Sequence, residues 1–343
     1  MLSLKHEAHT TKALTMIEYM DTATPDYRAT FEGAVFYNET TAGRIFMRGQ
    51  DCIALLHRLS TNDLRKLQPG QGTQTVLTTS IGRIIDVLTI HAFEDALLVV
   101  TSPEQGPPIF GYLRKNIFFN DQVTLEPAGR TYTQIAIYGT QAESILAVAT
   151  GISLKEIPLY HTVDATLAEA SIIISRRKPL GGQGFTLYIP LEHSEAVQEH
   201  LRNAGAMPLS EESFDILCIE QGYGAFGREL STEYIPLETD LLDAVSFTKG
   251  CYVGQEIIAR MESRNRLAKQ LRGLRLSQPV TAPAKLVVDG KEAGDLTSAV
   301  VSPRFGPIAL AYVRTAHAAV GSTVHIASTD VQGKVVDLPF MEE

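Results

Sequence analysis

The pattern of the chain changes at Leu271. Beyond this residue helical spacing stops, and short apolar runs alternate with proline and glycine. The runs cover residues 274–276, 285–288, 294–301, 308–313, 323–326 and 333–336. Short strands separated by such turn residues are typical of small all-β domains. We therefore expect residues 271–343 to form a β-domain of their own, either a barrel or a sandwich.

The part of the chain before Leu271 mixes helical and strand patterns. Periodic apolar residues predict helices over residues 50–59, 107–118, 141–149 and 194–203. Alternating apolar runs predict strands over residues 43–47, 75–79, 83–91, 96–101, 133–138, 171–175 and 184–189. We interpret residues 28–270 as an α+β region, and residues 1–27 as a polar helical arm that ends at Pro25.

The charge and the cysteine content argue against several classes of protein. The 343 residues are 44% hydrophobic and carry a formal net charge of -9, so neither nucleic acid nor an acidic membrane is expected as a partner. No apolar run approaches the roughly 20 residues that span a bilayer, and the N-terminus lacks the apolar stretch of a secretory signal. The three cysteines form no C-x-x-C pair. We therefore expect a cytoplasmic protein without disulfides or structural zinc.

The most informative motif covers residues 249–256, which read K-G-C-Y-V-G-Q-E. Cys251 lies between two glycines and two residues after Lys249. This lysine, and a helix that opens at Gly254 or Gln255, would both lower the pKa of the thiol and favour a reactive thiolate. The alternative is a small hydrophobic side chain beneath a loop, since free cysteine is among the most buried residue types. The two interpretations are evenly matched on these residues.

Two acidic residues lie in apolar surroundings. Glu220 ends an apolar run just before Gly222, where its carboxylate could accept two parallel hydrogen bonds from an amino-heterocycle. Its spacing fits a surface glutamate at a helix end better. Asp86 lies within an apolar strand, and would need a partner or a raised pKa if it pointed inward. The commoner outcome for such a residue is a side chain on the solvent face of a half-exposed strand.

With these residues in view, the chain resembles the folate-binding superfamily of the glycine-cleavage T-protein, an aminomethyltransferase. Within it the chain is most similar to the YgfZ-type branch, whose members assist iron–sulfur cluster assembly or repair and carry a K-G-C-[FY]-x-G-Q-E motif. The likeness runs from about Phe31 to Val336. It implies three units in a ring around a central folate channel, the first two interleaved in sequence and the last an antiparallel β-barrel.

The resemblance also implies roles for individual residues around bound tetrahydrofolate. Glu220 would hold the pterin, Asp86 would lie near the reactive folate nitrogen, and Phe185 would line the channel. Cys251 would be the functional thiol with Lys249 beside it. Other residues of the motif and its helix would contribute to the folate site, with a basic group for the anionic folate tail: Gly250, Tyr252, Gly254, Gln255, Glu256 and Arg260.

Five positions depart from the T-protein pattern. Cys218 stands where the T-protein has an arginine, Val87 replaces an aspartate, Thr101 replaces an asparagine, and the G-Y-E triplet becomes residues 184–186, which read G-F-T. The resemblance thus favours a folate-binding accessory protein that serves iron–sulfur proteins or assembly factors. The alternative is a folate-dependent aminomethyl or methyl transferase with Asp86 as general base.

Overall fold

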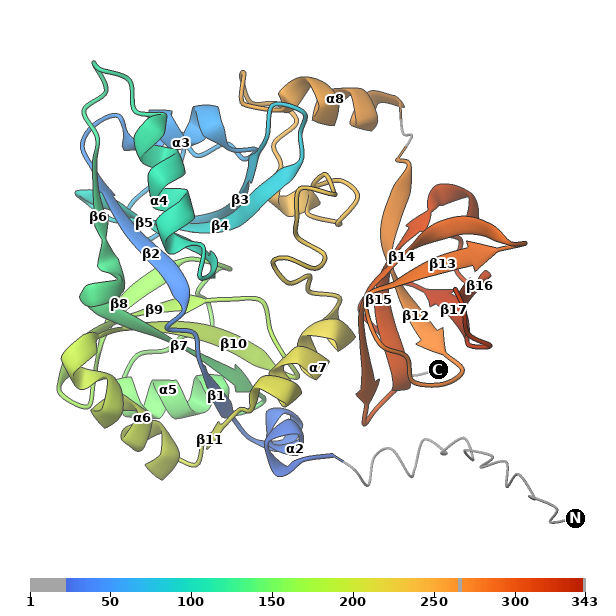
Figure 1. The fold of residues 1–343 in the computed structure, drawn as a ribbon. Coiled ribbons are helices and arrows are strands. Elements are labelled where there is room, and N and C mark those ends of the chain that lie inside the picture. The colour runs from blue at the N-terminus through green and yellow to red at the C-terminus, as the bar shows by residue number, and fades with distance from the viewer. Residues whose placement is uncertain (1–22, 265–266, 342–343) are drawn as a thin grey trace, which may run out of the picture.

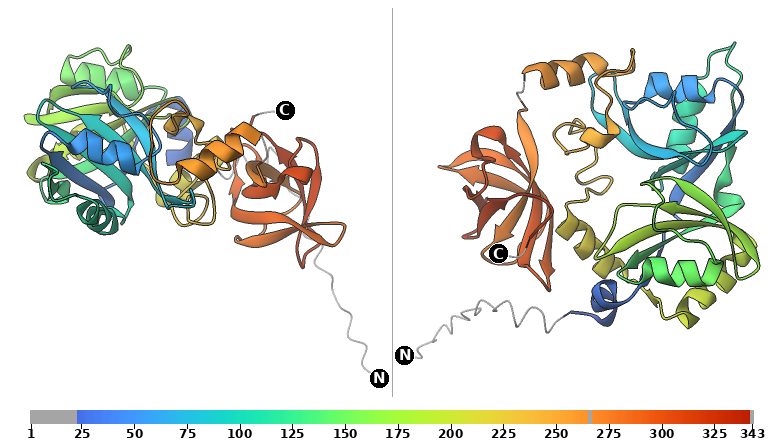
Figure 2. Two further views of the ribbon diagram at one scale, coloured as in Figure 1. Left: turned by 90° about the horizontal axis from the view of Figure 1, so that it is seen from above. Right: turned by 180° about the vertical axis from the view of Figure 1, so that it is seen from behind.

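Three units form a ring in the computed structural model, which describes residues 23–264 and 267–341 (Figures 1 and 2). Two units are α+β layers and the third is a β-barrel. The segment between residues 222 and 254 runs through the middle of the ring. No helix among the described residues is long and apolar enough to cross a membrane.

The first unit is a five-stranded sheet with two helices on one face. Its strand order is β3-β4-β5-β2-β6, with bounds Gly72–Thr78, Ile84–Ala92, Ala96–Pro103, Ala42–Arg48 and Thr124–Pro127. The helices are α3 (Cys52–Leu59) and α4 (Gly106–Lys115). Their apolar faces pack on the sheet in one buried cluster, which explains the helical spacing seen in the sequence.

The second unit is a six-stranded sheet that shares the chain with the first. Its order is β11-β1-β7-β10-β9-β8, with bounds Met207–Pro208, Val35–Asn38, Tyr132–Gly139, Gln183–Pro190, Ala170–Arg176 and Thr162–Leu167. Helices α5 (Ala142–Thr150) and α6 (Ser194–Asn203) cover one face. Because β1 precedes the whole first sheet in sequence, the two units are interleaved, as the resemblance implied.

The third unit is a closed six-stranded barrel rather than a sandwich. Its order is β12-β15-β14-β13-β16-β17, with bounds Lys269–Leu276, Gly306–Arg314, Lys291–Ser302, Ala284–Val288, Thr323–Ile326 and Gln332–Val336. All its strand pairs are antiparallel. Closure leaves no unpaired sheet edge.

Three further α-helices join the units, together with short 3₁₀ turns. They are α2 (Pro25–Glu32), α7 (Glu211–Gln221) and α8 (Gln255–Arg264); the 3₁₀ turns are Ala128–Arg130, Leu191–His193, Leu242–Ala244 and Thr315–His317. The prediction that a helix ends at Pro25 is wrong. Pro25 begins α2, because its fixed φ suits the first turn of a helix and Thr24 caps that turn. The remainder of the predicted arm, residues 1–22, lies outside the described residues.

Candidate functional site

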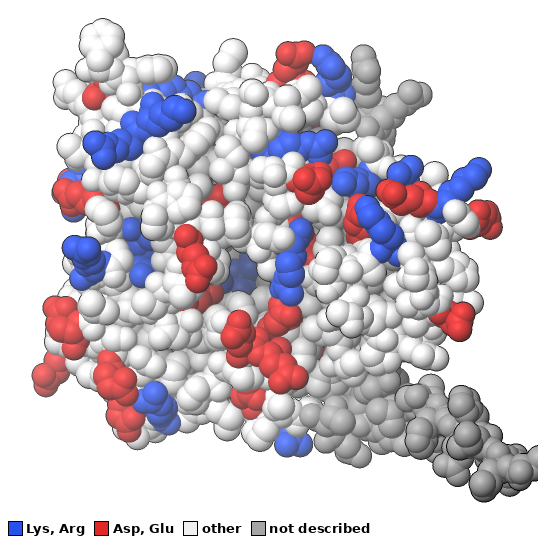
Figure 3. All heavy atoms as spheres, in the orientation of Figure 1, with Lys and Arg blue, Asp and Glu red and all other residues white. Residues whose placement is uncertain are grey.

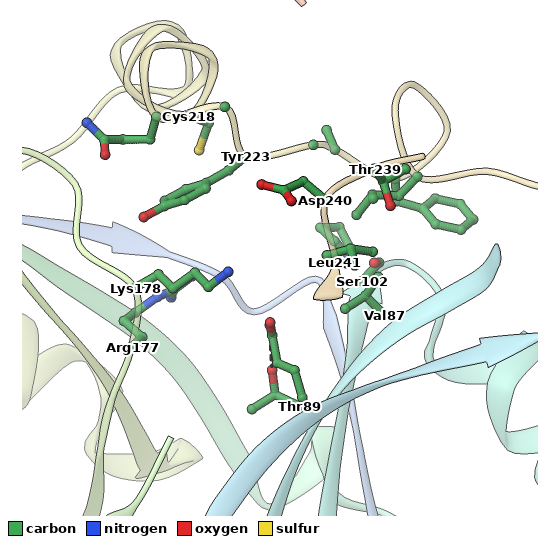
Figure 4. A pocket seen from close by; sticks show the side chains of 18 of the residues that line it. Val87, Thr89, Ser102, Arg177, Lys178, Cys218, Tyr223, Thr239, Asp240 and Leu241 are labelled. Carbon is green, nitrogen blue, oxygen red and sulfur yellow. Dashed lines mark hydrogen bonds between the residues drawn. The ribbon is translucent and has the colours of Figure 1, made fainter. Parts of the chain in front are cut away.

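A large cavity lies at the centre of the ring. Its volume is about 1630 Å³, and its lining comes from both sheets, from the barrel end of the chain and from the central segment. Thr89 belongs to the first sheet, Tyr188 to the second, Leu338 follows the barrel and Asp240 lies in the central segment. Figure 4 shows Arg177 and Lys178 on one wall, with Asp240 and Tyr223 opposite them.

The second sheet presents alternate residues to the cavity. On β10, Thr186 and Tyr188 line the cavity, whereas Phe185 and Leu187 point into the core beneath α5 and α6. Successive side chains of a strand point to opposite faces, so a shift of one residue exchanges cavity for core. The prediction that Phe185 lines the channel is therefore wrong, and the residue beside it, Thr186, does so.

Three polar side chains form the cavity wall over the second sheet. Glu39, in the link between β1 and β2, accepts hydrogen bonds at its Oε2 from Arg177 at 2.6 Å and from Gln134 at 2.8 Å. The Arg177 guanidinium also lies over the ring of Tyr138, 5.0 Å from its centroid. The Oε1 atom of Gln134 is buried and has no partner among the described residues. We call Glu39, Gln134 and Arg177 the Glu39 cluster.

A neutral histidine supports the neighbouring wall. His91 is 1% exposed, and burial lowers its pKa to about 4. Its Nδ1 lies 3.0 Å from the carbonyl oxygen of Tyr160, which can only accept, so Nδ1 carries the proton. Nε2 is then an acceptor, and the Tyr188 hydroxyl donates to it at 2.8 Å. The hydroxyl of Tyr188 is thereby fixed in orientation at the cavity.

Asp86 lies in β4 directly behind the cavity wall. Its side chain is fully buried and accepts hydrogen bonds from the backbone N–H of Ser102 at 3.2 Å and of Val87 at 2.9 Å. Ser102 and Val87 line the cavity, but Asp86 itself does not. Burial raises the pKa of Asp86 to about 6, and the hydrogen bonds from Ser102 and Val87 offset part of that rise. The folded protein therefore keeps this carboxyl group protonated to a higher pH than an aspartate in the unfolded chain.

Glu220 points away from the cavity. Its Oε1 accepts hydrogen bonds from the hydroxyls of Tyr27 and Ser302, both at 2.6 Å, and so joins α2 and the barrel to α7. Cys218 and Gln221 face the cavity from the same helix. Two residues of a helix turn the side chain by about 200°. The prediction that Glu220 reaches a ligand in the cavity is therefore wrong in this structure, because the phase of α7 directs it to the barrel.

Lys249 holds the motif loop and is not free to assist a thiol. It is 4% exposed, and its ammonium donates to the carbonyl oxygens of His57 at 2.7 Å, Ser60 at 2.7 Å and Asn62 at 2.6 Å. These bonds use all three of its protons. Burial lowers the pKa of Lys249 to about 8. The lysine therefore anchors the motif loop to the end of α3 and the turn that follows it.

The loop ends at a glycine that the structure requires. Gly254 has φ +84°, and a Cβ there would lie 2.7 Å from the carbonyl oxygen of Thr79. α8 begins at the next residue, Gln255, as expected. Cys251 is exposed, and Gly250 beside it has open space around it. The thiol is thus reachable from solvent, which excludes the alternative of a core cysteine at this position.

The remaining predicted residues lie on α8 and its approach. Tyr252 is buried against Ile258, and Arg260 forms an ion pair with Glu256 at 2.6 Å on the exposed face of α8. None of the residues predicted for the site lines the cavity. These residues are Asp86, Phe185, Glu220, Lys249, Gly250, Cys251, Tyr252, Gly254, Gln255, Glu256 and Arg260. The motif stabilises a loop near the ring, and other residues form the cavity wall.

Four of the five positions that depart from the T-protein pattern line the cavity. They are Val87, Thr101, Thr186 and Cys218, and they come from both sheets and from α7. Burial raises the pKa of Cys218 to about 12, so its thiol is neutral at physiological pH. Charged or amide groups of the T-protein pattern are thus replaced by smaller side chains where a ligand would be contacted.

Most basic groups around the cavity are already paired. Arg177 pairs with Glu39 at 2.6 Å, and Arg272 pairs with Asp337 at 2.7 Å. Lys178 forms no ion pair within the described part of the chain, and its ammonium lies 5.9 Å from the ring centroid of Tyr223. On the face shown in Figure 3, basic and acidic side chains are interspersed. Much of the positive charge around the cavity is therefore neutralised by acidic side chains of the protein itself.

Sequence reasoning missed the Glu39 cluster. One signal was available: residues 176–178 are three consecutive basic residues at the end of a predicted strand. Glu39 and Gln134 gave no such signal, because a single polar residue near a strand is usually solvated. Only the pairing of β1 with β7 brings them together.

Comparison with known proteins agrees with this architecture. The GCVT N-terminal domain matches residues 12–249, and the glycine cleavage T-protein C-terminal barrel domain matches residues 269–342. The putative transferase At1g60990, chloroplastic, of Arabidopsis thaliana is 31% identical over 310 residues, which cover 90% of this chain and 72% of that protein. An aminomethyltransferase of Exiguobacterium sibiricum is 28% identical over 321 residues, covering 92% and 88%.

A solved structure has the same fold. The glycine cleavage system aminomethyltransferase T from Bartonella henselae superposes with a TM-score of 0.83 at 21% identity, covering 95% of this chain and 90% of that one. The two domain matches together span both α+β units and the barrel. The chain therefore belongs to the glycine cleavage T-protein family.

Proposed function

We propose that the protein binds a tetrahydrofolate in the central cavity and transfers a one-carbon group to or from it. Family membership and the names of its transferase relatives support this class of activity. The observation that carries the proposal is Asp86, a buried carboxyl group with a pKa of about 6 whose hydrogen-bond donor, Ser102, faces the cavity. An acid tuned towards neutral pH is what general acid–base chemistry requires.

The residues of the cavity fit such a ligand. A volume of about 1630 Å³ is ample for a molecule of this size, and the buried Oε1 of Gln134 lacks a donor. Bound tetrahydrofolate would supply the nucleophilic nitrogen that carries the one-carbon group. The chain would contribute the carboxylate of Asp86, which lies directly behind Val87 and Ser102 and would accept the proton once it reaches the cavity between these two residues. It would also contribute the ammonium of Lys178 for an anionic tail. Lys178 takes the place predicted for Arg260.

Turnover tests the proposal directly. Purified protein, tetrahydrofolate and an aminomethyl or methyl donor should yield a one-carbon folate, detected by liquid chromatography and mass spectrometry. Asp86→Asn should reduce the rate by at least about 100-fold if Asp86 moves the proton. Asp164→Asn, an exposed aspartate on β8, is the matched control and should keep full activity. Absence of product with several donors would count against a transferase.

A second function, support of iron–sulfur cluster assembly or repair, is favoured by one observation. Cys251 is exposed in a loop that Lys249 and Gly254 hold in place. The octad around it resembles the motif of the YgfZ-type branch. No group of three or more potential metal ligands is found among the described residues, and a cluster usually takes four thiolates. Any cluster would therefore share Cys251 with a client protein or an assembly factor.

A substitution of Cys251 distinguishes the two proposed functions. In cells that lack the native gene, Cys251→Ser should fail to restore iron–sulfur enzyme activities if the thiol acts on clusters. The same variant should keep any folate turnover, because Cys251 does not line the cavity. Full restoration by the serine variant would remove the thiol from the proposal.

A further inference from the structure

Only one of the two carboxylate oxygens of Glu39 accepts hydrogen bonds from side chains of the Glu39 cluster. Oε2 of Glu39 accepts two hydrogen bonds, from Arg177 and Gln134. Oε1 accepts none from the described residues, and it is not among the buried polar atoms without a partner. Glu39 lines the cavity with a side chain that is 13% exposed. Its Oε1 is therefore an acceptor that a molecule in the cavity can reach.

A second acceptor lies in the same cluster. Gln134 is 5% exposed and lines the cavity, and its Oε1 is buried without a hydrogen bond in the described structure. An unsatisfied buried oxygen costs about 1–3 kcal/mol, so a ligand that donates to it gains affinity. Carboxylate and amide oxygens accept only, and both therefore select a ligand that presents N–H groups.

The cluster is held rigidly. The backbone N–H of Glu39 donates to the carbonyl oxygen of Gln134 at 2.9 Å, in addition to the bond between their side chains. Arg177 is stacked on Tyr138, and its Nη1 is 3.4 Å from the hydroxyl of Thr186. A fixed acceptor pair loses little conformational entropy when a ligand binds.

The charge of the Glu39 cluster limits the kinds of ligand that would fit it. Arg177 already neutralises Glu39, so a second cation is not required. Aromatic side chains border the cavity, and two of them, Tyr37 and Phe214, are stacked with ring centroids 4.1 Å apart. Flat aromatic walls beside fixed acceptors suit a neutral planar ring with N–H donors on one edge.

We propose that Glu39 and Gln134 bind the donor edge of a planar heterocycle in which a ring N–H lies beside an exocyclic amino group. This edge occurs in pterins and in guanines. The choice of a pterin rather than a guanine rests on the proposed folate function. The inference assigns recognition of the pterin to Glu39 instead of Glu220, whose side chain points from α7 to the barrel.

Matched heterocycles test the assignment by calorimetric titration. Pterin carries the amino group, whereas lumazine has an oxo group at the same ring position. The wild-type protein should bind pterin about tenfold or more tightly than lumazine, the loss expected when one hydrogen bond to a charged group is missing. Glu39→Gln should remove most of this preference, because its amide can turn a donor toward the oxo group. Glu192→Gln, at an exposed glutamate in the 3₁₀ turn Leu191–His193 outside the cavity, is the control and should retain the preference.

The stability of the variant needs its own control, because Glu39→Gln leaves Arg177 without its carboxylate. Circular dichroism and thermal unfolding should show a folded protein. The double variant Glu39→Gln, Arg177→Met removes both charges and should show the same lost preference. Equal binding of pterin and lumazine by the wild type would overturn the inference without any variant.

The outcomes separate the two proposals. If the wild type binds tetrahydrofolate and Glu39→Gln keeps the preference for pterin, the assignment of Glu39 is wrong and folate binding stands. If the wild type binds guanosine in a manner that depends on Glu39 but binds no folate, the donor edge stands and the folate function is wrong. Binding of none of these compounds refutes both.

Discussion

Replacing Asp86 by asparagine should make the protein more stable at neutral pH and change its stability little near pH 4. Burial raises the pKa of Asp86 from 3.8 to about 6. The folded protein therefore holds this proton more tightly than the unfolded chain does. The protonated Asp86 therefore contributes no penalty to the free energy of unfolding below about pH 4. As the pH rises towards 6 the unfolded chain ionises first, so the free energy of unfolding falls, and above pH 6 it no longer changes because of this group. Asparagine has no such dependence.

The size of the effect follows from the pKa values. A change in pKa from 3.8 to about 6 corresponds to about 3 kcal/mol, at 1.36 kcal/mol for each factor of ten in the acid constant. Urea unfolding curves followed by circular dichroism between pH 4 and pH 8 measure it. The difference between Asp86→Asn and wild type should grow by about 2–3 kcal/mol from pH 4 to pH 7 and then level off.

An exposed aspartate supplies the comparison. Asp164→Asn on β8 should give a curve parallel to that of the wild type. If the Asp86→Asn curve is parallel as well, Asp86 is ionised at little cost in the folded protein. The reasoning that makes it an acid–base group near pH 6 would then be refuted.

Three further predictions concern the motif loop. Lys249→Met should lower the free energy of unfolding by about 3 kcal/mol or more, because three backbone carbonyls lose their donor; thermal unfolding measures this. Gly254→Ala should destabilise by more than about 2 kcal/mol because of its positive φ and the backbone oxygen 2.7 Å away, whereas Gly250→Ala, with open space, should stay within about 0.5 kcal/mol in the same assay. In the native protein a thiol reagent should modify Cys251 rapidly and buried Cys52 only after unfolding, as peptide mass mapping would show; equal rates would contradict the placement of these thiols.

Local pattern predicted most of the fold. Four of the five strands of the first sheet, and the strands of the barrel, follow from short apolar runs between turn residues, and the observed elements agree within a few residues. Strand β6 was not predicted. Helix α7 was not predicted. Phe214, Ile216, Leu217 and Ile219 place apolar groups around most of its circumference, so no single face stands out. The direction of Glu220 could not be inferred for the same reason.

The site was harder to predict than the fold, because its geometry depends on contacts that are distant in sequence. The octad correctly predicted a helix that starts at its second glycine or at the residue after it. It could not show that the Lys249 ammonium would meet carbonyls of residues 57, 60 and 62. Nor could alternation on β10 show whether Phe185 or Thr186 faces the cavity, because the packing of α5 and α6 on the sheet determines which face is buried.

The interleaving of the two sheets has a consequence for biosynthesis. β1 leaves the ribosome before the first sheet, but its partners β7 and β11 follow much later. All strands of the first sheet lie between β1 and β7 in sequence, so this sheet can form while β1 is still unpaired. Glu39 immediately follows β1, so its wall of the cavity is assembled only once β7 has been translated. A nascent chain halted before β7 would hold a complete first sheet but would lack the cavity wall that contains Glu39.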